Sequence, residues 1–284
     1  MGRRVLMGST LALVAAGLLW LDARLAPGHV AFAVAALLAL LAHVELARMG
    51  HFRALALGLP LRCAWIALAV FQLRALGAPR GYGPLEEFGL LYLLAGFGLL
   101  LGTMGAHLAA RMGSRPPPPA AVWPLGLWLL PPIFMLVRIE LEWGTLGLVV
   151  LVVLAKIGDN AGYFVGRAVG KRHPFPALSP GKTVAGCVAS LLAGVAAGAA
   201  LLPFTLGEPG LRGILVGAAV GGLVNVGAQA GDLSESWIKR RAGVKDSSTW
   251  LGPSGGILDV IDSLFFAAPA ALLLWSLLYA PAGT

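Results

Sequence analysis

Residues 231–262 hold the densest concentration of charged side chains in the chain, and apolar segments lie on both sides of them. Read as a helix that ends at Gly243, this stretch brings Asp232, Glu235 and Lys239 to one face, because they recur at intervals of three and four residues. Carboxylates supply the oxygen ligands that Mg²⁺ prefers, and lysines and arginines neutralise phosphate groups. The stretch therefore predicts a site for a metal-bound nucleoside triphosphate.

The second part of this stretch is expected to be a loop that leads into another helix. Lys245 and Asp246 fall in the loop. Residues 255–256 are both glycine, which allows the backbone to approach a ligand closely. Asp259 and Asp262 follow, three residues apart, where the next apolar segment begins.

A second group of candidate residues lies at the junction of two earlier apolar segments. Gly162, Gly166 and Gly170 recur every four residues, so one face of the predicted helix is bare enough for close contact with a neighbouring helix or a substrate. Ser179 followed by Pro180 predicts an N-cap and a first helical residue, which would direct free backbone N–H groups toward an anion.

Each of these features has a simpler interpretation. Asp159 lies one turn after Lys156 in a predicted span, so an ion pair between the two is the alternative to a role in a site. Lys182 and Thr183 lie where a capped helix start alone would explain the pattern. The charged stretch could also be a basic loop that only orients a membrane protein, but orientation has no use for spaced carboxylates.

The composition is that of an integral membrane protein. Of the 284 residues, 58% are hydrophobic and 12% are charged, and the mean hydropathy is +0.84. The net charge of +8 does not indicate nucleic acid as a partner, because the basic residues cluster between apolar segments without interleaved aromatic residues. Cys63 and Cys187 lie in apolar segments and lack the spacing of metal ligands.

Apolar windows of about twenty residues predict an all-α, polytopic transmembrane bundle of about nine spans. The windows cover residues 5–21, 30–47, 54–76, 88–110, 121–137, 144–165, 183–203, 211–230 and 256–279. With the N-terminus inside and the C-terminus outside, most of the 21 lysines and arginines face the cytoplasm, as the positive-inside rule requires. The loops 166–183 and 231–256 are then cytoplasmic, and Asp22 and Arg138 fall in outer connections.

Four prolines at residues 116–119 form a rigid connector, which is the candidate domain boundary. Residues 1–115 are expected to be an N-terminal transmembrane bundle that acts as a scaffold or as an oligomer contact, a homodimer being one arrangement. Residues 121–284 are expected to be the catalytic transmembrane domain.

The charged stretch resembles the signature of the phosphatidate cytidylyltransferase (CDP-diacylglycerol synthase) family. The residues in register with it are Ser236, Lys239, Arg240, Lys245, Asp246, Gly255, Gly256, Asp259 and Asp262. The chain departs from the signature at Ser254, where the family has His, and at Val260, where it has Arg. Upstream matches extend the resemblance over residues 155–265, at Asp159, Tyr163, Gly166, Arg167, Ser179, Pro180, Lys182 and Thr183.

The resemblance implies an enzyme that transfers a cytidylyl group from CTP to phosphatidate, giving CDP-diacylglycerol and pyrophosphate in phospholipid biosynthesis. It implies Mg²⁺, with a second cation as a further candidate, and a bacterial cytoplasmic membrane with the active site facing the cytoplasm. The expected catalytic residues are Asp246, Lys245, Lys239, Arg240 and Ser236. The expected substrate contacts are Ser179, Lys182, Thr183, Arg167, Tyr163, Gly255, Gly256 and Ser254. The expected metal ligands are Asp232, Asp246, Asp259 and Asp262, with Asp159 as a further candidate.

Two other functions stay open from the sequence. A CTP-dependent kinase of a lipid alcohol, of the dolichol or phytol kind, resembles residues 159–186 but does not account for residues 245–262. A non-catalytic transporter would distribute acidic residues over many helices at mid-depth, whereas only Asp159 and Lys156 come close to that pattern.

Overall fold

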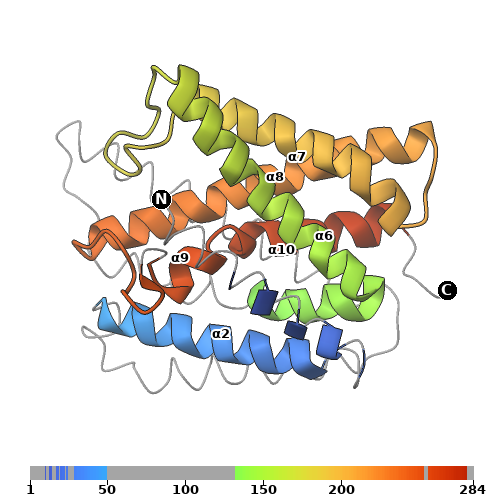
Figure 1. The fold of residues 1–284 in the computed structure, drawn as a ribbon, viewed down its shortest axis with the longest axis horizontal. Coiled ribbons are helices and arrows are strands. Elements are labelled where there is room, and N and C mark those ends of the chain that lie inside the picture. Colours follow the sequence, from blue (N-terminus) through green and yellow to red (C-terminus); the bar gives the residue numbers. More distant parts are fainter. Residues whose placement is uncertain are drawn as a thin grey trace.

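The computed structural model describes residues 29–49, 132–252 and 255–279, together with scattered positions between 10 and 24. In these residues every regular element is a helix, which confirms the all-α class for the part of the chain described (Figure 1). The helices are α2 (His29–Arg48), α6 (Pro132–Val169), α7 (Val184–Thr205), α8 (Leu211–Arg241), α9 (Ile257–Ile261) and α10 (Leu264–Leu278).

Four helical segments within the described ranges are long and apolar enough to cross a membrane. They are Met135–Val169, Val184–Thr205, Leu211–Arg241 and Ile257–Leu278. The chain is therefore an integral membrane protein of the helical type. The spans expected over residues 54–76 and 88–110 and the proline connector lie outside the described residues.

α6 extends over the end of the span expected at residues 121–137 and the whole of the span expected at 144–165, but residues 138–143 between them are helical and not a connecting loop. The helix continues through residues 138–143 and breaks only at Gly144, where φ is 70° and ψ is 177°. Glycine permits this break because it has no Cβ to clash at positive φ. Arg138, expected in the outer connection, is instead buried in the helix and pairs with Glu142 one turn later.

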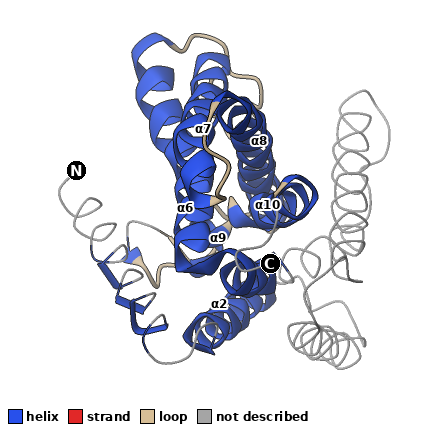
Figure 2. Cartoon of the chain, turned by 90° about the vertical axis from the view of Figure 1, so that its right-hand side faces the viewer, coloured by secondary structure: helices blue, strands red, loops and turns tan. Residues whose placement is uncertain are grey.

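α10 is the most enclosed of the described helices. It packs against α6 and α8, while α2 lies on the opposite side of the bundle from α7 (Figure 2). Phe265, Phe266 and Trp275 have no exposed surface, and the ring of Trp275 meets that of Trp143 edge-to-face, with centroids 5.6 Å apart. Contact with two neighbouring helices explains why most of this segment is apolar and buried.

Glycines bring α7 close to both of its neighbours, α6 and α8. A Cβ added to Gly162 of α6 would lie 3.0 Å from the carbonyl oxygen of Gly186. On the other side, a Cβ added to Gly198 would lie 2.7 Å from the Cα of Gly221 in α8. The bare glycine face expected on α6 is therefore confirmed, and its partner is a helix.

The two loops that carry the sequence motifs lie at the same end of the bundle. Residues 170–183 connect α6 to α7 and residues 242–256 connect α8 to α9, both at the left of Figure 1. The connection between α7 and α8 lies at the opposite end. Arg240, in the last turn of α8, contacts both loops, because its Nε donates a hydrogen bond to the carbonyl oxygen of Leu178 at 3.3 Å and its Nη1 donates one to that of Val244 at 3.4 Å.

Asp22 is not the solvated outer residue that the sequence suggests. Its side chain is buried, and Oδ1 accepts hydrogen bonds from the backbone N of Val30 at 2.5 Å and of Ala31 at 3.0 Å. These N–H groups belong to the first turn of α2, where no carbonyl of the helix can accept them. A carboxylate there also interacts favourably with the helix dipole, so Asp22 stabilises the start of α2.

Candidate functional site

The last turns of α8 carry polar groups on one face. Ser236 Oγ donates to Asp232 Oδ1 at 3.5 Å, and Lys239 Nζ lies 2.6 Å from Glu235 Oε2. Each pair is four residues apart, so the expected sharing of one helix face is confirmed. The helix ends at Arg241, just before the glycine expected to stop it.

Carboxylates and lysines converge beside this face into one group, the acidic–lysine cluster. Carboxylate oxygens of Asp232, Glu235 and Asp262 lie within 4.8 Å of one another. The ion pairs are Lys182 with Asp232 (2.6 Å), Lys156 with Asp262 (3.2 Å), Lys239 with Glu235 (2.6 Å) and Lys239 with Asp259 (2.5 Å). The cluster combines residues of α6, α8, α9, the turn before α7 and the junction of α9 and α10, so no single stretch of sequence contains it.

Three of these acids form a donor set suited to Mg²⁺. Glu235 is buried, and its Oε1 has no hydrogen-bond partner among the described residues. A buried carboxylate oxygen without a donor is costly unless a cation or water approaches it. Asp232 and Asp262 were expected ligands, whereas Glu235 was not. Its spacing of three residues from Asp232 was the signal that could have identified it.

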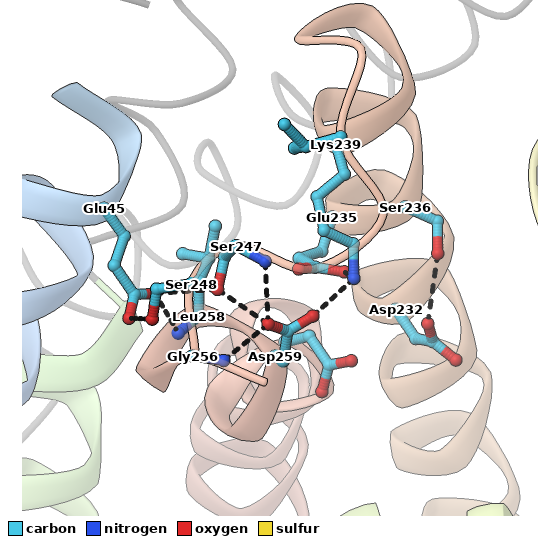
Figure 3. Close-up of polar contacts among 12 residues, drawn as sticks. Glu45, Asp232, Glu235, Ser236, Lys239, Ser247, Ser248, Gly256, Leu258 and Asp259 are labelled. Atoms are coloured by element: carbon cyan, nitrogen blue, oxygen red, sulfur yellow. Dashed lines mark hydrogen bonds and ion pairs between the residues drawn. The ribbon is translucent and has the colours of Figure 1, made fainter. Parts of the chain in front are cut away.

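Asp259 and Asp246, also expected as ligands, lie outside this three-carboxylate group. Asp259 Oδ2 accepts hydrogen bonds from Ser247 N at 2.9 Å, Ser247 Oγ at 2.7 Å and Gly256 N at 2.7 Å, and Oδ1 receives Lys239 (Figure 3). With four donors around it, the carboxylate holds the loop and the start of α9 together. Asp246 is exposed on the same loop.

A pocket next to the cluster is lined by α6, α8, the start of α7 and the turn that precedes it. Its polar residues include Asp159, Tyr163, Lys182, Thr183 and Asp232. Lys182 and Asp232 belong to both the pocket and the cluster, so a molecule bound in the pocket would reach the carboxylates. The pocket thus brings together three of the expected substrate contacts.

Lys156 does not form the ion pair with Asp159 that the sequence left as an alternative. Its Nζ instead lies 3.2 Å from Asp262 Oδ1 on a different helix. Asp159 is exposed and lines the pocket. The spacing of one helical turn between Lys156 and Asp159 therefore did not identify the ion-pair partner of Lys156.

Thr183 is the N-cap of α7, and the expectation that Ser179 has this role is wrong. Thr183 Oγ1 accepts a hydrogen bond from Gly186 N at 3.1 Å, and the helix begins at Val184. Ser179 begins a turn that Lys182 closes by donating its backbone N–H to the Ser179 carbonyl oxygen at 3.1 Å. Proline and glycine at the centre of that turn favour it over a helix start.

Comparison with known proteins gives a family for this arrangement. A model of the cytidylyltransferase family matches residues 2–278. The chain belongs to the cytidylyltransferase family. It is 33% identical over 232 residues to the phosphatidate cytidylyltransferase of Brucella suis. The aligned residues cover 80% of this chain and 83% of that protein. The phosphatidate cytidylyltransferase of Aquifex aeolicus is 36% identical over 149 residues, covering 52% of this chain and 54% of the relative.

Three residues that match the family's motifs lie in or next to the two loops: Arg167 in the last turn of α6, Arg240 in the last turn of α8, and Lys245 in the loop that follows α8. Arg167 Nη1 donates to the hydroxyl of Tyr163 at 3.1 Å. Arg240 donates to the carbonyl oxygens of Leu178 and, at 3.4 Å, Val244. Lys245 is exposed. Arg167, Arg240 and Lys245 therefore lie outside both the cluster and the lining of the pocket.

The two glycines of the family signature face side chains of the protein. Gly255 has a φ of 81°, which favours glycine, and a Cβ added to it would lie 2.8 Å from Asp259 Cγ. A Cβ added to Gly256 would collide with the carboxylate of Glu45 and the hydroxyl of Ser247. The glycines were expected to let the backbone approach a ligand closely. In the structure they let it approach the side chains of Asp259, Glu45 and Ser247.

Of the two residues that depart from the family signature, Val260 is among the described residues. Val260 is partly buried and packs against the hydrophobic core, where an arginine would need a partner for its charge. Ser254 lies outside the described residues.

A further polar residue at the site, Glu45, comes from α2 and lies outside the signature. Its side chain has no exposed surface, and its carboxylate contacts both the loop before α9 and the first turn of α9 (Figure 3). Sequence reasoning missed it because no other candidate residue lies near it in the chain. The available signal was a lone acid in an apolar window.

Proposed function

We propose that the protein is a CTP:phosphatidate cytidylyltransferase, which joins CTP to phosphatidate, releases pyrophosphate and gives CDP-diacylglycerol for phospholipid biosynthesis. The observation that carries this proposal is the convergence of carboxylates and lysines beside a pocket in a membrane-embedded member of the cytidylyltransferase family. Both substrates are phosphate anions, and cations beside metal-binding carboxylates are the groups that bring such anions together.

The reaction needs no general base. The phosphomonoester of phosphatidate is already an anion at about pH 7, so its oxygen can attack the α-phosphorus of CTP. A bond forms between that oxygen and the α-phosphorus, and the bond to the bridging oxygen of pyrophosphate breaks with its electron pair leaving on pyrophosphate. No covalent enzyme intermediate is required, and Ser254 in place of the family's His is compatible with the reaction because no proton has to be removed.

The lysines of the cluster are held in place for this reaction. Lys182 faces the pocket and is fixed by Asp232, and Lys239 is fixed between Glu235 and Asp259. Positive charges that are positioned before the substrates bind stabilise the transition state without reorganising during the reaction. The protein thereby aligns two anions and offsets their mutual repulsion.

Mg²⁺ fits the three carboxylates of Asp232, Glu235 and Asp262, which are hard oxygen ligands close enough to share one ion. Bound there, it would offset the charge of the phosphates and the charge that develops on the leaving pyrophosphate. A second cation, with Asp159 as a candidate ligand on the pocket wall, belongs to the same proposal.

We further propose about nine spans, with the N-terminus in the cytoplasm and the C-terminus outside, in a bacterial cytoplasmic membrane. Residues 1–115 would form the N-terminal bundle and a homodimer contact. Cysteines introduced singly at Lys171 and Arg241 should then stay unlabelled by an impermeant maleimide in intact cells. Labelling at either position would overturn this orientation.

One assay tests the proposed activity. Purified protein is incubated with Mg²⁺ and labelled CTP, together with either phosphatidate or a polyprenol. The expected result is pyrophosphate and a labelled lipid with phosphatidate only. Release of CDP and phosphorylation of the polyprenol would instead establish a lipid-alcohol kinase, and no turnover with either would contradict both enzyme functions.

A further inference from the structure

We propose that Glu45 is a positioning residue for the reaction: from α2, it fixes Ser247 and Ser248 of the loop and the start of α9, and so sets the positions of Asp259 and Lys239. The inference rests on the proposed function for its kinetic consequences. The contacts that carry it are independent of that function, because they lie between described parts of the protein.

Glu45 faces four hydrogen-bond donors in a region about 200 residues later in the chain, one of which, the Ser247 hydroxyl, it shares with Asp259. Its Oε1 accepts from Ser248 Oγ at 2.7 Å and from the backbone N of Ile257 at 2.9 Å. Its Oε2 accepts from Ser247 Oγ at 2.8 Å and from the backbone N of Leu258 at 2.9 Å. Each carboxylate oxygen therefore receives one hydroxyl and one backbone donor.

The two backbone donors belong to the first turn of α9, which has only five residues. A helix this short cannot satisfy its own N-terminal N–H groups, and a carboxylate is the acceptor that suits them best. Gly256, just before α9, leaves no space for a Cβ beside the Glu45 carboxylate. The packing is thus specific for the carboxylate in this position.

A chain of polar contacts connects Glu45 to the acidic–lysine cluster (Figure 3). Ser247 Oγ lies between Glu45 Oε2 at 2.8 Å and Asp259 Oδ2 at 2.7 Å, and the two carboxylates share its single hydroxyl proton. Asp259 Oδ1 in turn receives Lys239, which also pairs with Glu235 of the three-carboxylate group. A shift of the loop would therefore move Asp259 and release Lys239 from one of its two acids.

A second contact joins α2 to the same loop. The guanidinium of Arg48 lies over the ring of Trp250, 4.7 Å from its centroid. Arg48 is three residues after Glu45 and so extends from the same side of the helix. The C-terminal turn of α2 thus contacts the loop at two points, through the buried Glu45 and the exposed Arg48.

The decisive variant is Glu45→Gln, which keeps the volume but replaces one acceptor oxygen by an NH₂ group that faces two donors. We expect kcat to fall by about 10- to 100-fold with a change in the KM for CTP of less than about threefold, because the groups are displaced and not removed. Glu142→Gln is the matched control. It also removes a buried carboxylate, but one that pairs with Arg138 far from the loop, so it should affect stability and leave kcat nearly unchanged.

A double-mutant cycle distinguishes positioning from general destabilisation. Ser247→Ala interrupts the same chain of contacts, so its effect on kcat should not add to that of Glu45→Gln. Additive losses in the double variant would show that the two residues act separately and would overturn the proposed connection.

A third measurement does not depend on activity. Thr249→Cys, in a background with Cys63→Ser and Cys187→Ser, places a thiol at an exposed position of the loop. Its rate of maleimide labelling in folded, detergent-solubilised protein should rise several-fold with Glu45→Gln and stay unchanged with Glu142→Gln. If Glu45→Gln speeds the labelling but the wild-type protein has no activity with CTP and phosphatidate, the proposed function is wrong and the contact between Glu45 and the loop is still supported. Unchanged labelling together with unchanged kcat would overturn the inference.

Discussion

The charged residues at the end of α8 and those of the loop that follows are adjacent in sequence, yet they differ in structure. Glu235 and Lys239 are buried and bonded to one another, and Asp232 is held by Lys182. Lys245 and Asp246, a few residues later, are exposed. Charges fixed in a region with little water interact more strongly with a bound anion than charges on a solvated loop do. One continuous motif therefore contains two kinds of charged residue. We call Asp232, Glu235 and Lys239 the rigid centre and Lys245 and Asp246 the exposed rim.

The largest loss is expected when the rigid centre loses an acid. Glu235→Gln removes one of three carboxylates without changing the volume, so kcat should fall by about 10³-fold and the Mg²⁺ concentration for half-maximal rate should rise. Rates measured over a Mg²⁺ titration test this. Glu208→Gln, at an exposed position in the α7–α8 connection, is the control. A Glu235→Gln protein with the wild-type rate and metal dependence would remove Glu235 from the site.

A smaller loss is expected for the lysine that connects the centre to the pocket. Lys182→Gln removes the charge that faces the pocket and leaves Asp232 without its ion-pair partner, so kcat/KM for CTP should fall by about 10²-fold. Lys171→Gln changes an exposed lysine on the same loop and should stay within about twofold of the wild type. Equal losses for the two variants would mean that only the summed charge of the loop matters.

The exposed rim should tolerate substitution better than the centre. Asp246→Asn should lower kcat/KM by about tenfold at most, mainly through the KM for CTP, since the loop is solvated and its charges are screened. Steady-state kinetics beside Glu235→Gln measures the difference between the two regions directly. If Asp246→Asn were as damaging as Glu235→Gln, the loop would have to close on the substrates and the distinction between centre and rim would fail.

The smallest effect on the rate is expected far from the cluster, at the start of α2. Asp22→Asn weakens the acceptor for the N–H groups of Val30 and Ala31, which should cost about 1 kcal/mol of stability and lower the melting temperature by a few degrees. The rate per folded molecule should stay within about twofold of the wild type. A tenfold loss of kcat in protein that melts normally would show that both ends of α2 act on the site.

The sequence predicted the elements of this structure better than the contacts between them. Apolar windows locate α7 within two residues of its observed ends, and the spacing of Asp232, Glu235 and Lys239 correctly predicts one polar face. Both features are local, so they follow from hydropathy and helical periodicity alone. The connection between the windows 121–137 and 144–165 was expected to contain Arg138, whereas Arg138 pairs with Glu142 inside the helix and the break lies at Gly144.

The contacts that assemble the site could not be predicted in the same way. Lys156 was weighed with the nearest acid in sequence, but its partner Asp262 is 106 residues away. Glu45 and Ser247 are 202 residues apart. Which acid a lysine pairs with depends on how the helices pack, and the sequence predicts a glycine face for close contact without showing which helix packs against it.

The length of α8 has a consequence for where the two substrates meet. Its 31 residues make a rod about 46 Å long, at about 1.5 Å per residue, whereas the hydrocarbon layer of a bilayer is about 30 Å thick. Asp232 is about 32 Å from the start of the helix, so a bilayer whose hydrocarbon layer begins at the start of α8, with the helix upright, would place the cluster at the depth of the lipid headgroups. A lipid phosphate can arrive there by lateral diffusion with its acyl chains still in the bilayer, and a water-soluble nucleotide can reach the same depth without crossing any apolar layer.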